Sequence, residues 1–184
     1  MRDKLEFREH LFEEPEEGLV CLDNLTARRV PDDGYRLIHV NTVIATHDAV
    51  ITYDGGVVLM ERTGAPLKGF LWLPGGRMQR GVQTEDSLVT AVERECGLDI
   101  SKLEFAGVDR AFMPSDPLGH RRGTDTITTI FYCNGQGELL RDVDERHNHP
   151  ILVRPREYAG IRDKLHPFVQ KYTDVAIGRI SSGK

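Results

Sequence analysis

Cysteine is scarce in this chain of 184 residues, and its spacing excludes the common paired motifs. The three cysteines, Cys21, Cys96 and Cys133, are odd in number, lie far apart and include no C-x-x-C pair. Reduced thiols in a cytoplasmic protein are the simplest explanation of this usage. We therefore expect a cytoplasmic protein whose core needs neither disulfides nor a structural metal.

Long hydrophobic runs are also missing. No stretch approaches 18 consecutive apolar residues, and the segment MRDKLEFREHLFEEPEEG at the start is too charged for a signal peptide. The sequence therefore predicts neither a membrane span nor an export signal.

The chain lacks an excess of positive charge. It has 24 Lys and Arg against 29 Asp and Glu, for a net charge of −5, which argues against nucleic acid as a partner. A local basic pocket for a phosphorylated small molecule is still compatible with this total, because steering depends on local potential. With 39% of its residues in the hydrophobic set, the chain is expected to form one core.

Residues 1–36 differ in composition from the rest. Four glutamates surround Pro15, and the turn sequence Pro31-Asp32-Asp33-Gly34 follows. We interpret this segment as an N-terminal extension to a domain at 37–184. Two alternatives are open: a solvated arm, or an arm that contacts a second copy in a homodimer or covers the site.

Strand patterns precede and follow one helical pattern in residues 37–184. A strand-like pattern begins at Leu37, and a hairpin is expected around Asp54-Gly55-Gly56. Residues 84–96 have helical spacing, with Thr84 as a possible cap and Gly97 as the stop. Further strands are expected at 70–73, 105–112 and 126–133, and a last helix at 162–172. This order predicts an α+β fold, an α/β/α sandwich with helices flanking a sheet.

A Pro-Gly-Gly turn at residues 74–76 lies between an expected strand and the helix at 84–96. Glycines there leave backbone groups open to close approach, which suits a diphosphate or its metal. Taken alone, this turn is equally compatible with a plain structural bend.

The residues around that turn resemble a motif of a known protein family. Gly69-Phe70-Leu71-Trp72-Leu73-Pro74-Gly75-Gly76-Arg77 is followed, without a gap, by the spacing that ends at Gly97-Leu98. This segment resembles the Nudix box, G-x5-E-x7-R-E-U-x-E-E-x-G-U with U aliphatic, in frame from Gly76 to Leu98. The resemblance implies a Nudix-like mixed sheet flanked by helices.

The chain departs from that box at its charged positions. Val82 and Thr90 replace the charge pair that braces the loop, and Ala91 and Arg94 replace two of three acids on the helix. Only Glu95 is retained, so the resemblance implies at most one Mg²⁺ where the family gathers several.

Within the family, the chain resembles the nucleotide-sugar hydrolases related to GDP-mannose mannosyl hydrolase. Arg62-Thr63, Pro66, Gly123-Thr124-Asp125 and Asp144-Glu145-Arg146-His147 extend the match. The resemblance implies that the Gly75 carbonyl and Glu95 bind a single Mg²⁺ and that His147 is the general base. Arg146 stands where the subgroup has a ligating Gln, so this metal is expected to bind weakly.

Other polar residues have two interpretations each. Arg62 and Arg77 are candidate diphosphate ligands. Arg94 either contacts phosphate or forms an ordinary surface ion pair on the helix. Asp125 either orients a sugar hydroxyl or begins a strand with a turn-type hydrogen bond. His147 is either a base or part of a solvated loop.

Two functions follow as hypotheses. The first is a Nudix-type hydrolase of a nucleoside diphosphate linked to a sugar or similar group, with weakened metal dependence. Attack on the sugar carbon and attack on phosphorus are both open. The second is a catalytically inactive Nudix-fold module that binds a nucleotide or a partner protein, because several charged positions are replaced.

Overall fold

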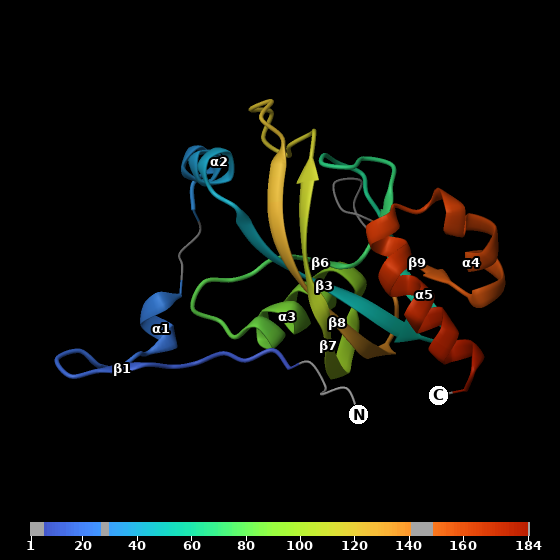
Figure 1. Cartoon of the computed structure of the whole chain (residues 1–184), viewed down its shortest axis with the longest axis horizontal. Coiled ribbons are helices and arrows are strands. Elements are labelled where there is room, and N and C mark those ends of the chain that lie inside the picture. Colours follow the sequence, from blue (N-terminus) through green and yellow to red (C-terminus); the bar gives the residue numbers. More distant parts are fainter. Residues whose placement is uncertain (1–5, 27–29, 141–148, 184) are drawn as a thin grey trace.

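The computed structural model describes residues 6–26, 30–140 and 149–183. Its main element is a mixed sheet of seven strands with helices on both faces (Figure 1). Its strands are β3 (Ile44–Tyr53), β4 (Gly56–Glu61), β5 (Leu71–Trp72), β6 (Gly75–Arg77), β7 (Leu98–Met113), β8 (Thr124–Gly137) and β9 (His149–Val153). A separate two-stranded sheet consists of β1 (Glu13–Glu14) and β2 (Gly18–Leu19). The helices are α1 (Leu22–Leu25), α2 (Asp32–Asn41), α3 (Thr84–Cys96), α4 (Pro155–Ile161), the 3-10 turn η1 (Arg162–Lys164) and α5 (Pro167–Ser181).

Strand β3 organises the sheet. It pairs in parallel with β8 along most of its length, and the other pairings in the sheet are antiparallel. Its C-terminal end pairs with β4 and its N-terminal end pairs with β6, so β3 changes partner between Asp48 and Ile51. The predicted α+β sandwich with a mixed, helix-flanked sheet is confirmed.

The alternation of side chains along β3 builds a core on each face of the sheet. Val50 packs on the face covered by α4 and α5, whereas Ala49 and Ile51 pack on the face covered by α3. Both cores consist of side chains that are almost completely buried. Because successive residues of a strand point to opposite faces, the polar residues in the N-terminal half of β3 are also divided between the two faces of the sheet.

The hairpin and the central helix agree with the sequence patterns. Asp54 and Gly55 form the tight turn between β3 and β4 with positive φ angles of 42° and 71°, as an Asp-Gly hairpin requires. Helix α3 spans the predicted residues, and Gly97 ends it in the left-handed region at φ 71°.

Three local predictions are wrong. Residues from Leu37 to Asn41 continue α2, so the strand begins only at Ile44. The last helical region is divided into α4, η1 and α5, because Pro167 begins a new helix. The strand expected at 70–73 is shorter, because β5 is Leu71–Trp72 and Phe70 is 43% exposed. Trp72 is buried and stacks on Phe168 with ring centroids 5.0 Å apart.

The N-terminal segment contacts the sheet domain at specific points. Phe7 packs against Phe105 and Phe131, with ring centroids 5.7 Å and 6.0 Å away. The Glu9 carboxylate accepts hydrogen bonds from the backbone N–H and hydroxyl of Thr84, so Glu9, rather than Thr84 itself, caps α3. Beyond these contacts the chain extends away from the sheet through β1 and β2 (Figure 1).

The predicted boundary at residue 36 falls inside α2, which runs from Asp32 to Asn41. The three cysteines are free, and two of them, Cys96 and Cys133, are buried. Among the helices formed by the described residues, none is both long and apolar enough to span a membrane.

Candidate functional site

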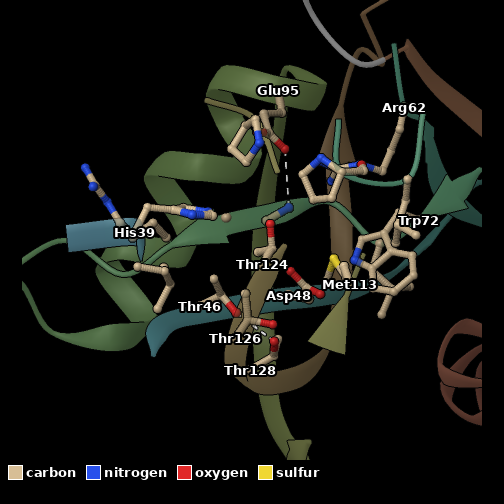
Figure 2. Close-up of a pocket in the computed structure, with 18 of the residues that line it drawn as sticks. His39, Thr46, Asp48, Arg62, Trp72, Glu95, Met113, Thr124, Thr126 and Thr128 are labelled. Atoms are coloured by element: carbon tan, nitrogen blue, oxygen red, sulfur yellow. Dashed lines mark hydrogen bonds between the residues drawn. The ribbon is translucent and has the colours of Figure 1, made fainter. Parts of the chain in front are cut away.

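A cavity of about 250 Å³ opens over the N-terminal half of β3, beside β6 and β8. The floor of the cavity lies on the same face of the sheet as the core that α4 and α5 cover. In the cavity, the polar side chains of Thr46 and Asp48 occupy the pleat positions that continue from Val50 along β3 (Figure 2). Its lining includes Tyr35, His39, Thr46, Asp48, Arg62, Trp72, Gly75, Gly76, Arg77, Glu95, Pro117, Thr124, Thr126 and Thr128.

The Gly-Gly turn forms β6 and lies against β3. Gly75 pairs with Asp48, and Gly76 pairs with His47. A Cβ atom at Gly75 would overlap the carbonyl oxygen of His47 and the side chain of Asp48, at a φ of 150°. The close approach of the two strands therefore requires glycine at this position, whereas a Cβ at Gly76 would meet nothing within 4 Å. The backbone at Gly76 is thus open to a ligand.

Glu95 connects α3 to this turn. Its Oε2 atom accepts a hydrogen bond from the backbone N–H of Gly75 at 3.3 Å (Figure 2). The side chain is 23% exposed and lines the cavity. The two residues that the resemblance paired as metal ligands, Gly75 and Glu95, are therefore adjacent in the fold.

Asp48 is a buried carboxyl group in the cavity, between Glu95 and the threonines of the floor (Figure 2). Burial, together with the charge of Glu95, raises the pKa of Asp48 to about 8. A hydrogen bond from Trp72 and the charge of Arg62 act in the opposite direction. Asp48 therefore holds a proton at neutral pH. The sequence analysis missed this residue, although an acidic side chain inside the strand run from Ile44 to Tyr53 is a usable signal.

Arg62 and Arg77 both line the cavity. Their binding to a diphosphate stays a prediction. The Arg62 Nε atom donates a hydrogen bond to the carbonyl oxygen of Pro66 at 2.7 Å, which fixes the guanidinium at the end of β4. The guanidinium of Arg77 stacks over the Tyr35 ring at 4.3 Å. Burial lowers the pKa of Arg62, but arginine stays charged in proteins.

Alternating threonines of β8 form an uncharged part of the floor. Thr124, Thr126 and Thr128 point to the cavity face, and Thr46 of β3 joins them. The hydroxyl oxygens of Thr46 and Thr128 lie 2.6 Å apart. The sequence analysis also missed these residues, although three threonines at a spacing of two in a strand are a period-two signal.

The structure places two predicted residues away from the cavity. Arg94 is 64% exposed and lies 3.8 Å from the Glu95 carboxylate, as in the surface-pair interpretation. Asp125 forms a bidentate ion pair with Arg110 across β7 and β8 at 2.8 Å and 3.0 Å. Neither residue is part of the lining. His147, with Arg146, lies outside the described residues.

The loop at 114–123, which joins β7 to β8, borders the cavity through Pro117. The arginines of this loop, Arg121 and Arg122, are exposed and are not among the lining residues. Its contribution to the cavity wall is therefore uncharged.

The residues around the cavity fit a metal ion only in a limited way. Among residues 6–26, 30–140 and 149–183, no group of three or more His, Cys, Asp or Glu side chains could hold one. Glu95 is one carboxylate beside a backbone carbonyl, and Asp48 is protonated. Because Mg²⁺ commonly binds through one or two carboxylates together with substrate phosphates, this set fits a single ion shared with a ligand.

Comparison with known proteins agrees with this arrangement. The family model for the NUDIX domain matches residues 44–174, which is most of the chain. The chain belongs to the Nudix family. Nudix hydrolases generally use divalent metals such as Mg²⁺. The matched region contains the β6 turn, α3 and the strands that form the cavity floor.

Two relatives have similar sequences. The chain is 27% identical over 146 residues to the low-salt glycan biosynthesis protein Agl8 of Haloferax volcanii, covering 79% of this chain and 90% of that protein. It is 33% identical over 111 residues to the ADP-ribose pyrophosphatase of Methanocaldococcus jannaschii, covering 60% of this chain and 61% of that protein.

Solved Nudix structures share the fold at low sequence identity. A MutT Nudix hydrolase from Burkholderia pseudomallei superposes with a TM-score of 0.55 at 19% identity, covering 75% of this chain and 98% of that one. The Nudix domain of NrtR from Shewanella oneidensis, solved with ADP-ribose, gives 0.56 at 14% identity over 76% of this chain and 90% of that one.

Proposed function

We propose that this Nudix protein hydrolyses a nucleoside diphosphate linked to a sugar or a similar hydroxyl-bearing group. One observation carries the proposal: two arginines, an open glycine backbone and one carboxylate, Glu95, surround a single cavity. The cations and the glycine turn suit a diphosphate, and the threonine floor suits an uncharged polar group beside it.

Arg62 and Arg77 bind the diphosphate in this proposal. Their planar guanidinium groups can each donate two hydrogen bonds to phosphate oxygens. Arg62 is anchored by the Pro66 carbonyl and Arg77 by the Tyr35 ring, so both groups are held in place before the ligand arrives. Such anchoring reduces the entropy that binding costs.

A single Mg²⁺ would be held by Glu95 and the Gly75 carbonyl together with the diphosphate. When bound, the ion supplies positive charge that stabilises negative charge developing on phosphate oxygens. Glu95 supplies the ionised carboxylate that holds the ion. Asp48, which keeps its proton, instead donates a hydrogen bond to a ligand oxygen.

The attacking water needs a base, and we retain His147 in that role on the resemblance alone. An imidazole titrates near neutral pH and as a general base contributes roughly 10² to 10⁴-fold. The names of the relatives support the substrate class: one is a glycan biosynthesis protein and the other an ADP-ribose pyrophosphatase.

The experiment is a ³¹P NMR screen of nucleoside diphosphate sugars, including ADP-ribose and GDP-mannose, with and without Mg²⁺. We expect phosphate-containing products that form faster with Mg²⁺. Repeating the reaction in ¹⁸O-water then locates the attack, because label in the sugar means attack on carbon and label in phosphate means attack on phosphorus. Absence of any product at high enzyme concentration would overturn the proposal.

A non-catalytic nucleotide-binding module is the second candidate. The observation in its favour is that the acids of the Nudix helix are reduced to Glu95, while Arg62, Arg77 and the Gly75-Gly76 turn still line the cavity. Tight binding of a nucleotide sugar, without turnover in Mg²⁺ or Mn²⁺, would favour this candidate over hydrolysis.

A further inference from the structure

Two buried histidines join α2 to the loop at 114–123. The Nδ1 atom of His39, on α2, lies 2.7 Å from the Nε2 atom of His120 in the loop. His39 is 6% exposed, and the side chain of His120 is 3% exposed. Both imidazoles are therefore fixed by burial as well as by their hydrogen bond.

Asp116 builds the loop that holds His120. Its carboxylate accepts hydrogen bonds from the backbone N–H groups of Leu118, His120 and Arg121 at 2.8–3.0 Å. The Asp116 side chain is 4% exposed. Because three backbone groups are bound to one buried carboxylate, the position of His120 is determined by the loop rather than by His39.

The hydrogen bonds determine which ring nitrogens carry protons. The backbone N–H of Arg122 donates to Nδ1 of His120 at 3.1 Å, so this nitrogen is an acceptor and the proton of His120 is on Nε2. Asp116 Oδ2 is 3.6 Å from the same Nδ1, too far for a hydrogen bond that would reverse this assignment. His120 Nε2–H therefore donates to His39 Nδ1, and the proton of His39 is on Nε2.

The surroundings of His39 favour this neutral state. Burial lowers the pKa of His39, the neighbouring His120 lowers it further, and Asp116 raises it less. Tyr35, on the same helix, contacts the His39 ring edge-on, with ring centroids 6.0 Å apart. The aromatic ring adds to the burial of His39 and supplies no charge that would favour its protonation.

His39 lines the cavity close to the threonines of its floor. Figure 2 shows it on the opposite side from Arg62, with Thr46, Thr126 and Thr128 along the floor. Its Nδ1 is engaged by His120, so Nε2–H is the ring group left to meet a ligand. A neutral N–H donor beside threonine hydroxyls is suited to hydroxyl and ring oxygens, whereas a diphosphate is better matched by the arginines.

We propose that His39 contacts the sugar of the substrate, donating its Nε2–H to a sugar oxygen, and that His120 is the positioning residue that fixes this tautomer. The inference rests on the proposed function, because it assigns a specificity residue to the same cavity. It also gives α2, which precedes the matched Nudix region, a part in substrate selection.

The tautomer is tested in the free protein, without any ligand. Long-range ¹H–¹⁵N NMR of the imidazole groups at pH 7.5 is expected to show the proton on Nε2 in both His39 and His120. A proton on Nδ1 of His39 would overturn the arrangement. Replacing His120 by Ala is expected to produce a mixture of His39 tautomers, whereas H120Q, which keeps a donor near the Nε2 position, preserves the Nε2–H form.

The contact with sugar is tested by a matched pair of variants at one position. Asn reaches the position of histidine Nδ1, so the amide oxygen of H39N can accept from His120, but the shorter side chain places no donor at the Nε2 position. Gln reaches the position of Nε2, so H39Q keeps a donor to the ligand. H39N is expected to weaken the binding of a nucleotide sugar about tenfold, as loss of one hydrogen bond implies, and H39Q to weaken it less.

Calorimetry with ADP-ribose, GDP-mannose and inorganic pyrophosphate separates the outcomes. We expect H39N to weaken only the nucleotide sugars, whereas R62A weakens pyrophosphate as well. Nucleotide sugars that bind the wild type and H39N equally would overturn the role of His39 and leave the proposed function standing. If no nucleotide sugar binds the wild-type protein, the proposed function fails and the role of His39 fails with it.

Discussion

At the scale of single residues, the site depends on two carboxyl groups in different protonation states. Glu95 is partly exposed, and its carboxylate accepts a hydrogen bond from the Gly75 backbone. Asp48 is buried, and burial raises its pKa to about 8. At neutral pH the environment therefore makes Glu95 the charged group and Asp48 a hydrogen-bond donor.

Replacing Glu95 by Gln should remove the charge while keeping the shape of the side chain. We expect kcat/KM for a nucleotide sugar to fall at least tenfold, which corresponds to about 1.4 kcal/mol of transition-state stabilisation. Glu93→Gln is the matched control, because Glu93 is exposed on the same helix and does not line the cavity. Equal losses in both variants would mean that Glu95 acts only through helix charge.

Asp48→Asn should change how stability depends on pH. The folded pKa of Asp48 is about 8, above the ordinary value of 3.8, so between these values only the folded state keeps the proton. The free energy of unfolding should then fall as pH rises from 4 to 8, by up to about 1.4 kcal/mol per unit from this group. Urea unfolding in EDTA should show a smaller decline for the variant, and an unchanged slope would contradict the assignment.

At the scale of elements, the position of the β6 turn depends on Gly75, because the absence of a side chain there permits β3 to approach closely. Gly75 has no room for a side chain, since a Cβ would meet the backbone of His47 and the side chain of Asp48. Glu95 belongs to the last turn of α3, and its hydrogen bond to Gly75 joins the helix to the β6 turn. A shift of the turn would therefore move the carboxylate as well.

Gly75→Ala is expected to destabilise the protein by about 2 kcal/mol or more, because the new methyl group must displace strand backbone. Activity should be lost along with the geometry of the turn. Gly160→Ala is the control, since a Cβ at Gly160, in α4, meets nothing within 4 Å. Thermal unfolding of both variants measures the difference, and a Gly75→Ala protein as stable as wild type would show that β6 can shift freely.

At the scale of the whole molecule, the N-terminal segment is attached to the domain by a few specific contacts. Phe7 joins the aromatic cluster on the α3 side of the sheet, and Glu9 caps α3. By contrast, Phe12 is 73% exposed on the extended part of the segment. A contact between this part and a second copy of the chain stays a prediction.

Phe7→Ala should therefore destabilise the protein by about 1–2 kcal/mol, because a half-buried aromatic ring leaves the core. Phe12→Ala should change the free energy of unfolding by less than about 0.5 kcal/mol. Chemical denaturation of the two variants makes the comparison. Equal stabilities would indicate that the segment is not attached to the domain in solution.

The sequence by itself determined the hairpin, α3 and the glycine turn, because these depend on neighbouring residues: an Asp-Gly pair, a helical period and a glycine stop. The resemblance to the Nudix box and to the residues on either side of it also predicted one ligand-binding site with Arg62, Arg77, Gly75 and Glu95. Only the tertiary structure brought Asp48, His39 and the β8 threonines to that cavity. Their roles depend on burial and on strands paired across long separations, which local patterns do not contain. The same long-range pairing placed Asp125 beside Arg110, away from the cavity that its motif suggested.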